Sequence, residues 1–372
     1  GVDLQAPVEV IGVAARLAEL PHLADPGVHL LRHRFRIVDD DLVAALRFFA
    51  QGQADELVDL LEVFPACGRT GEHQRERHVR VFRVQQDAED VEDLFGGAGA
   101  EILYPDPGFP PYRDAARASG ARPVAYPIRE EMDFGFDAEE VLSLVTPATR
   151  LIIINSPANP TGGVVSRREL AKLAEGLLRH PGVAVLSDEI YSHQTYDGEG
   201  FTSFLAFPEL RHRTIILDGW SKTFGMTGWR LGFGIWPAPW IPYVKKLITV
   251  DHSCTGVATQ MAGLAAITGP MDEVEAYRRS LEGRRDLVVA GLNGIRGVSC
   301  RKPGGAFYAF PNIKGTGRTS PALARALLEE AHVAVIHGES FGANGADYLR
   351  LSYAAPEPDL RQAIARMAAF LQ

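Results

Sequence analysis

The most informative part of this chain reads Ser221-Lys222-Thr223-Phe224-Gly225-Met226-Thr227-Gly228-Trp229-Arg230-Leu231-Gly232-Phe233. It follows the apolar run 214–217, which predicts a buried strand. A lysine just past such a strand, in a glycine-rich bend, suits amine chemistry on a carbonyl compound. A lysine that is desolvated or lies beside another cation loses its proton more easily, and its free amine then forms a Schiff base. The alternative is an ordinary surface lysine. However, only six of the 38 Lys and Arg residues are lysines, and only Lys222 has this setting.

Polar side chains follow two further apolar runs. Asp188 comes directly after 183–187, and Asn155 and Asn159 come after 151–154, ahead of a helical pattern at 166–178. Repeated strand, turn and helix predict a parallel sheet covered by helices. Ligands of open α/β sheets bind beyond the carboxyl ends of the strands, so we expect these side chains at a ligand site. The alternatives are a helix N-cap for Asp188 and a turn residue before proline for Asn159.

Four segments resemble the motifs of one enzyme family, the class I/II pyridoxal-phosphate-dependent aminotransferases of the aspartate aminotransferase fold type. They are Ser-Lys-x-x-x-x-x-Gly-x-Arg at 221–230, Asn155-Ser156-Pro157-Ala158-Asn159-Pro160-Thr161-Gly162, Asp188-Glu189-Ile190-Tyr191 and Tyr348-Leu349-Arg350-Leu351-Ser352-Tyr353. One such motif is weak support, whereas four with family-like order and spacing along the chain are strong support.

The resemblance implies that pyridoxal 5'-phosphate is held through a Schiff base to Lys222. The resemblance also implies that Asp188 pairs with the protonated ring nitrogen of the cofactor. A carboxylate in that position lets the ring act as an electron sink. Tyr191 and Asn159 are expected to hydrogen-bond the cofactor's phenolic oxygen. Lys222, Asp188 and Tyr191 are therefore the expected catalytic residues. For Tyr191 the alternative is a packed core aromatic.

Three more residues are expected to bind the cofactor. A guanidinium fork can hold two phosphate oxygens, so Arg230 suits the phosphate. Ser221 either contacts the phosphate or only shapes the bend, because the family often has a serine three residues before the lysine, where this chain has Gly219. Phe109, within Tyr104-Pro105-Asp106-Pro107-Gly108-Phe109-Pro110-Pro111-Tyr112, falls where the family stacks an aromatic ring on the cofactor. Its alternative is a core residue.

The substrate side of the site falls near the C-terminus. Arg350 lies in an apolar, strand-like run. The resemblance assigns it the substrate's α-carboxylate, with Asn159 as a second substrate-binding residue. The alternative for Arg350 is an ion pair on an edge strand.

Residues 1–95 do not resemble the family. The first 100 residues contain no Ser, Asn, Tyr, Lys, Met or Trp, and Thr70 is their only threonine. The expected glycine-rich substrate segment, the tyrosine that reaches a partner subunit and the phosphate cradle at a helix start are not recognisable there. Helical patterns occur at 39–49 and 54–64, and 96–99 marks the join. Two interpretations stay open: a fused or divergent segment, or a coding stretch read in the wrong frame or strand.

The length of 372 residues fits two lobes. We expect an α/β fold: a three-layer, mostly parallel sheet with helices on both faces, plus a smaller α+β C-terminal domain. The boundaries are an atypical segment at 1–95, a cofactor-binding large domain at 96–290 and a small domain at 291–372. A long helix is predicted at 273–293, a strand in 304–311, and helices at 322–331 and 358–371 around the Arg350 strand.

Composition limits the kinds of binding partner that we expect for this chain. A net charge of −9 argues against nucleic acid, and the three cysteines form no CxxC pair, which fits a reducing, cytoplasmic location without a metal site. No apolar run approaches the roughly 20 residues of a membrane span. The expected partners are therefore small molecules, an amino acid and a 2-oxo acid. The resemblance also implies a homodimer.

We thus expect an aminotransferase that moves an amino group between an L-amino acid and a 2-oxo acid through a Lys222 Schiff base. One alternative is another enzyme on the same scaffold, such as a β-lyase, decarboxylase or synthase, since fold does not fix the reaction. The other is an inactive, cofactor-binding pseudoenzyme, because the phosphate cradle is missing. Aspartate, alanine, aromatic and branched-chain amino acids all stay open as substrates.

Overall fold

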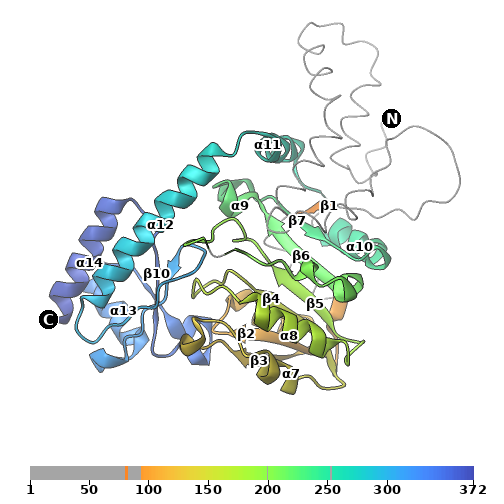
Figure 1. Ribbon diagram of the computed structural model, residues 1–372, viewed down its shortest axis with the longest axis horizontal. Coiled ribbons are helices and arrows are strands. Elements are labelled where there is room, and N and C mark those ends of the chain that lie inside the picture. Colours follow the sequence, from red (N-terminus) through yellow and green to blue (C-terminus); the bar gives the residue numbers. More distant parts are fainter. Residues whose placement is uncertain (1–79, 83–93, 199, 252–253) are drawn as a thin grey trace, which may run out of the picture.

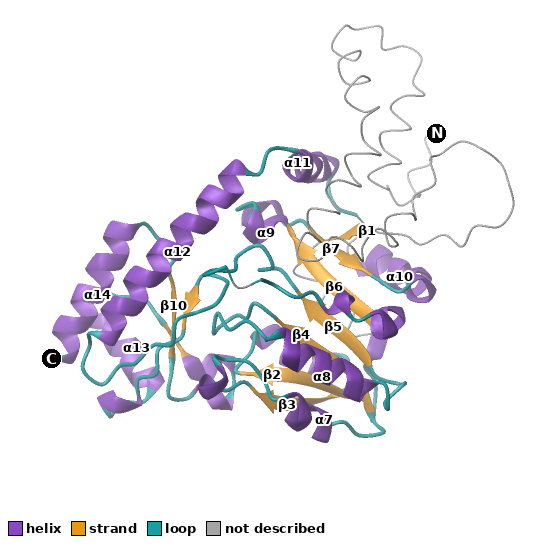
Figure 2. Cartoon of the chain, in the orientation of Figure 1, coloured by secondary structure: helices purple, strands orange, loops and turns teal. Residues whose placement is uncertain are grey.

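The computed structural model describes residues 80–82, 94–198, 200–251 and 254–372, which form two lobes (Figure 1). The large lobe is built on a seven-stranded sheet, and the small lobe carries a three-stranded sheet. The helices expected at 39–49 and 54–64 lie outside the described residues. Figure 2 shows helices flanking the large sheet and grouping around the small one.

The large sheet has the strand order β1-β7-β6-β5-β4-β2-β3. Its strands are β1 (Arg80–Phe82), β2 (Glu101–Asp106), β3 (Arg122–Pro127), β4 (Thr149–Asn155), β5 (Ala184–Asp188), β6 (Thr214–Gly219) and β7 (Gly232–Ile235). The neighbours from β3 to β6 pair in parallel, whereas β7 is antiparallel to both β6 and β1. Five parallel strands thus place their carboxyl ends along one edge of the sheet.

Alternation along β4 explains why both faces of this sheet are covered. Leu151 and Ile153 pack into one apolar cluster with residues of α6 and α10, whereas Ile152 and Ile154 pack on the other face with residues of α7 and α8. These helices are α6 (Pro110–Ala118), α7 (Ala138–Ser143), α8 (Arg167–Leu177) and α10 (Ile241–Asp251). Strand residues that are apolar on both faces are typical of buried parallel sheets. The predicted three-layer α/β architecture is confirmed.

The small lobe is an α+β unit, as predicted. Its antiparallel sheet has the order β8-β10-β9, with β8 (Tyr308–Ala309), β9 (Ile336–His337) and β10 (Leu349–Ser352). Its helices are α12 (Asp272–Asn293), α13 (Ser320–Glu329) and α14 (Glu357–Leu371). They share one apolar core with the sheet. In Figure 1, α12 runs from the neighbourhood of α11 (Val257–Thr268) to the side of α14, so it spans the two lobes.

One predicted strand is shorter than expected. The alternating pattern at 304–311 forms a strand only at Tyr308–Ala309. Ala306 adopts a left-handed conformation with φ of 56°, which a regular strand does not allow. Gly305 instead forms an isolated bridge with Thr195, so the residues before β8 attach to the loop that follows β5. The stretch therefore ties the small lobe to the large one.

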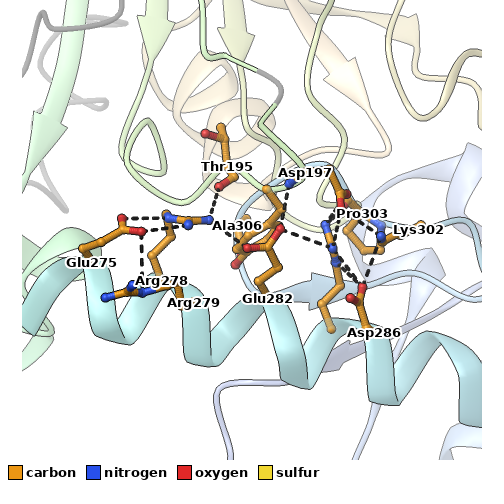
Figure 3. A network of polar contacts seen from close by, with 12 residues as sticks. Thr195, Asp197, Glu275, Arg278, Arg279, Glu282, Asp286, Lys302, Pro303 and Ala306 are labelled. Carbon is orange, nitrogen blue, oxygen red and sulfur yellow. Dashed lines mark hydrogen bonds and ion pairs between the residues drawn. The ribbon is translucent and has the colours of Figure 1, made fainter.

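An ionic network around one buried arginine reinforces this tie (Figure 3). Arg285 of α12 is fully buried, and its guanidinium donates to both carboxylate oxygens of Asp197 at 2.7 and 3.0 Å. Lys302 donates to the same carboxylate at 2.9 Å. Arg278 donates to the carbonyl of Thr195 at 3.1 Å. The loop after β5 is thus held against α12 by charge-assisted hydrogen bonds from several sides.

Among the described residues, no helix combines the length and the apolar character that crossing a bilayer requires.

Candidate active site

The predicted site residues converge at the carboxyl edge of the large sheet. Asn155 ends β4 and pairs in register with Asp188, which ends β5, while Lys222 follows β6 within α9 (Trp220–Thr223). Arg350 reaches the same region from β10 of the small lobe. Asn155, Asp188 and Lys222 thus meet because neighbouring parallel strands end side by side, whereas Arg350 is brought to them by the packing of the small lobe.

The Lys222 amine lies in an aromatic, partly buried environment. Its Nζ is 5.9 Å from the ring centroid of Tyr191 and 5.8 Å from that of Phe307. Burial lowers the pKa of Lys222, and the positive charges of Arg230 and Arg350 lower it further, against the opposing effect of Asp188. The amine therefore gives up its proton more readily than an exposed lysine does.

The Asp188 carboxylate is fixed by two donors. The hydroxyl of Tyr112 donates to its Oδ2, and the backbone N–H of Ile190 donates to its Oδ1 at 3.2 Å. Burial raises the pKa of Asp188, although both hydrogen bonds and the charge of Lys222 act in the other direction. A carboxyl group in this setting gains from a cationic partner, which removes the cost of burying its charge.

Phe109 contacts Tyr112, which in turn binds Asp188 at the site. It is the residue before α6, and its ring meets the ring of Tyr112 edge to face at 5.5 Å between centroids. Tyr112 in turn bonds Asp188. Tyr112 belongs to the sequence motif around Phe109, but its role at the site was not predicted. Its position three residues after Phe109, at the start of a helix, was the available signal.

Tyr191 pairs with a tyrosine from the other lobe. Its hydroxyl lies 3.0 Å from the hydroxyl of Tyr308 in β8, and both rings are buried. Burial raises the pKa of both phenols, so they stay neutral in the physiological range. Tyr308 was also missed from the sequence, where it looked like one more residue of an apolar strand.

Arg350 is held by an amide and two rings. Its Nη1 donates to Oδ1 of Asn159 at 3.0 Å, and its guanidinium carbon lies 4.7 Å from the ring centroid of Tyr308 and 4.8 Å from that of Phe341. Because β10 is the central strand of its sheet, the alternative of an edge-strand ion pair is wrong. Asn159 itself is positioned by Asn155, whose Oδ1 accepts from the Asn159 N–H at 2.9 Å.

The two predicted phosphate residues flank the lysine. The Ser221 hydroxyl is buried, and no hydrogen-bond partner is recorded for it among the described residues. Arg230 adopts a left-handed conformation with φ of 54°, and its Nη1 donates to the Thr227 carbonyl at 2.9 Å. Its charge is strong enough at the Lys222 amine to lower the pKa of that amine. An unpaired buried hydroxyl and a nearby guanidinium suit an anionic group.

Two more buried acids, Glu189 and Asp218, lie close in the chain to Asp188 and Lys222, and no local pattern distinguishes them as site residues. Glu189 accepts hydrogen bonds from the hydroxyls of Ser187 and Ser203 at 2.8 and 3.0 Å, and its burial raises its pKa to about 7. Asp218 accepts from the hydroxyl of Ser192 at 3.2 Å, and burial also raises its pKa. Asp218, at the end of β6, thus links the segment before Lys222 to the segment after Asp188, whereas Glu189 links the end of β5 to the turn at 203–204.

Comparison with known proteins agrees with this geometry. The family model for class I and II aminotransferases matches residues 84–367. The chain is 38% identical over 282 residues to an aspartate aminotransferase of Rhizobium meliloti, covering 73% of this chain and 68% of that protein. It is 38% identical over 274 residues to aromatic-amino-acid aminotransferase 2 of Thermococcus litoralis, covering 73% and 70%. An aromatic aminotransferase structure from Pyrococcus horikoshii superposes with a TM-score of 0.76 at 37% identity, covering 79% of each chain.

Members of this family depend in general on pyridoxal phosphate, and they act on amino and keto acids. The fold, the order of the motifs and the extent of the similarity agree on one assignment. The chain belongs to the class I and II aminotransferases and is a transaminase by that membership.

Proposed function

We propose that this chain transfers an amino group between an L-amino acid and a 2-oxo acid, with pyridoxal 5'-phosphate anchored by a Schiff base to Lys222. The observation that carries the proposal is the environment of the Lys222 amine. It is partly buried, its pKa is lowered by burial and by two arginines, and it lies at the strand ends together with Asp188. A nucleophilic amine of this kind is what carbonyl chemistry requires.

The residues around Lys222 fit this cofactor. Asp188 offers a carboxylate to a protonated ring nitrogen, and Tyr191 and Asn159 offer a hydroxyl and an amide to a phenolic oxygen. The hydroxyl of Ser221, which is buried and has no hydrogen-bond partner in the part of the chain that the structure describes, and the guanidinium of Arg230 suit a phosphate. The ring of Phe109, next to Tyr112, is a surface on which a planar ring can stack. Each polar group of the cofactor thus has a chemically matched residue.

Each of these side chains has a distinct task in the reaction. When bound, pyridoxal phosphate supplies a carbonyl carbon for the amino group and a ring that withdraws electrons. The Arg350 guanidinium orients the substrate by its α-carboxylate, which it can grip with two parallel hydrogen bonds. The free Lys222 amine would take a proton from the substrate α-carbon and return it to the former carbonyl carbon of the cofactor, on the other side of the transferred nitrogen. Asp188 keeps a proton on the ring nitrogen by stabilising its positive charge.

The first donors to test are suggested by the relatives. Proteins similar to this chain are named aspartate and aromatic-amino-acid aminotransferases. We therefore propose aspartate and the aromatic amino acids as the first candidates, with a 2-oxo acid as acceptor. The purified protein should convert the donor into its matching oxo acid while the acceptor gains the amino group. Release of ammonia together with a fragment of the donor would indicate a lyase instead.

We also propose a cytoplasmic homodimer. Trp229, within the segment that follows Lys222, and Val257, the first residue of α11, are apolar residues that are 51% and 50% exposed. Exposed apolar side chains of this size suit a protein interface, and twofold dimers are the commonest oligomers. The described cysteines, Cys254 and Cys300, are free thiols, as a reducing compartment favours. Sedimentation or light scattering tests the dimer directly.

We also propose a division of the chain into one N-terminal segment and two domains. We keep 1–95 as the atypical segment, 96–290 as the cofactor-binding domain and 291–372 as the small domain. The apolar core of the small lobe contains residues of β8, β10 and α14 together with α12 residues from Leu281 onward, so α12 connects the two proposed domains. The segment 1–95 contributes β1 to the edge of the large sheet.

A further inference from the structure

Tyr308 contacts both ends of the proposed site. Its hydroxyl lies 3.0 Å from the hydroxyl of Tyr191, and its ring centroid lies 4.7 Å from the guanidinium carbon of Arg350. Tyr191 belongs to the large lobe, whereas Tyr308 and Arg350 lie on neighbouring strands of the small lobe. One side chain therefore touches the residue proposed to bind the cofactor and the residue proposed to bind the substrate carboxylate.

The sheet of the small lobe fixes the contact with Arg350. Tyr308 pairs directly with Ser352 in the antiparallel ladder between β8 and β10. Arg350 is two residues from Ser352, so it lies on the same face of the sheet and diagonally opposite Tyr308, within reach of a long side chain. A guanidinium over an aromatic face is stabilised electrostatically, and the plane of the ring also limits the orientations of the guanidinium.

The hydroxyl of Tyr308 has a different task from its ring. Within the described part of the chain, Tyr191 is its one recorded hydrogen-bond partner. A phenol can donate one hydrogen bond and accept others. When Tyr308 donates to Tyr191, the proton of Tyr191 is left to donate to a third group. This arrangement also strengthens the donation, because linked hydrogen bonds polarise one another.

We propose that Tyr308 is a positioning residue of the aminotransferase site, which orients the Tyr191 hydroxyl through its own hydroxyl and supports the Arg350 guanidinium through its ring. This inference rests on the proposed function, because that function gives Tyr191 and Arg350 their ligands. The two contacts are chemically separable. Tyr308→Phe removes the hydroxyl and keeps the ring, whereas Tyr308→Leu removes both.

The charged groups near the tyrosine pair are the same in the wild type and in these variants. Asp188 from β5, Lys222 from α9, Arg350 from β10 and Arg230 are the ones whose charges act on Tyr191, Tyr308 or Lys222. Tyr308→Phe leaves all four in place. A change in proton affinity at the site in this variant is therefore attributable to the lost hydroxyl.

The test uses the full chain loaded with pyridoxal phosphate. The first readout is the pH midpoint of its visible absorbance, and the second is the dissociation constant of a non-reacting carboxylate, with maleate and 3-phenylpropionate as the two probes. When the Tyr191 hydroxyl donates less strongly, more negative charge stays on the phenolic oxygen of the cofactor. This charge favours the protonated form of the Schiff base at Lys222, which is the group that absorbs visible light. We expect Tyr308→Phe to raise the midpoint by about half a pH unit or more, with carboxylate affinity within about twofold of the wild type.

Tyr308→Leu should show the same rise of the midpoint and should also bind the carboxylate about three- to tenfold more weakly, as loss of a partly desolvated cation–π contact predicts. A double-mutant cycle tests whether the Tyr308 hydroxyl acts through Tyr191. In a Tyr191→Phe background, Tyr308→Phe should add no further shift of the pH midpoint, because the hydroxyl acts through Tyr191.

Tyr126→Phe is the matched control. It removes a buried phenol that donates to the Ile153 carbonyl at 2.7 Å, and it should change neither readout.

Each outcome separates the inference from the function. If the wild type develops a Lys222-dependent visible band but Tyr308→Phe keeps the wild-type midpoint and Tyr308→Leu keeps the wild-type affinity, the role of Tyr308 is wrong and the function stands. If the wild type develops no such band, the proposed function itself fails. A Tyr308→Phe protein that loses its thermal unfolding transition assigns the hydroxyl to folding and also contradicts the inference.

Discussion

The hydroxyl of Tyr112, in the first turns of α6, donates a hydrogen bond to the carboxylate of Asp188 at the end of β5. The two residues are 76 positions apart, and they meet because α6 follows β2, which lies beside β4 and one strand from β5 in the sheet. A hydrogen bond to the charged form of a carboxyl group favours that form. Tyr112 therefore helps to keep Asp188 ionised in a site whose burial favours the neutral acid.

Tyr112→Phe should weaken cofactor binding. Without the hydroxyl, Asp188 is a poorer partner for a cationic ring nitrogen, and a hydrogen bond to a charged group is worth about 1–2 kcal/mol here, or roughly a tenfold change in affinity. The dissociation constant of pyridoxal phosphate, followed by absorbance or fluorescence, checks this. An unchanged constant would remove Tyr112 from the site.

Arg350→Lys should raise the KM of the amino donor about 10- to 100-fold, because an ammonium cannot hold a carboxylate with two parallel hydrogen bonds. Steady-state kinetics with the donor identified for the wild type give the measurement. Arg366→Lys is the matched control. Arg366 donates to the His332 carbonyl from the exposed side of α14, and its replacement should leave KM as it is. Equal KM values for both variants would assign the carboxylate to another residue.

Glu189→Gln should gain stability relative to the wild type as the pH rises. Burial raises the pKa of Glu189 from its usual 4.5 to about 7, so the folded protein binds a proton there that the unfolded chain has released. Stability contributed by this neutral acid is present below pH 4.5 and is lost as the pH rises toward 7. The amide keeps an acceptor oxygen and has no charge to bury.

Thermal midpoints of the cofactor-free proteins between pH 5 and pH 8 measure this effect. The midpoint of Glu189→Gln minus that of the wild type should increase over the range by a few degrees, which corresponds to about 1–3 kcal/mol. Glu209→Gln, which changes an exposed carboxyl group, provides the reference. A difference that is constant or falls with pH would show that Glu189 is ionised in the folded protein.

Arg285→Met should destabilise the contact between the two lobes. The side chain of Arg285 is fully buried, whereas that of Asp197 is 42% exposed, so part of the ion-pair energy is screened by solvent. Loss of the guanidinium should therefore lower the free energy of unfolding by about 2 kcal/mol, less than for a pair buried on both sides. Arg361→Met removes an exposed pair with Glu357 on α14 and should cost about 0.5 kcal/mol or less. Denaturant unfolding compares the two variants, and similar losses would contradict the role of the network.

Much of the fold could be predicted from local patterns. The apolar runs at 151–154, 183–187 and 214–217 became the central strands β4, β5 and β6, because a parallel sheet covered on both faces needs continuous apolar strands. The pattern at 304–311 predicted a longer strand than the one that forms, because alternation of apolar residues does not reveal that Ala306 takes a left-handed conformation. Local sequence does not report a bend that is imposed by a bridge to Thr195.

The site was predictable where chemistry distinguishes a residue from its neighbours. Lys222, Asp188 and Arg350 stand out as charged residues at the ends of, or within, apolar strands. Tyr112 and Tyr308 were missed because aromatic residues are usual in cores, and because their partners lie 76 and 117 positions away. Such contacts depend on how the lobes pack, which no single segment encodes.

The assignment of Lys222 can be tested by the visible absorbance of the purified chain with added pyridoxal phosphate, recorded beside a Lys222→Ala variant. We expect a yellow band in the wild type that borohydride reduces to a stable adduct, and no such band in the variant. An equally strong, borohydride-reducible band in Lys222→Ala, or none in either protein, would contradict the assignment of Lys222 as the cofactor anchor.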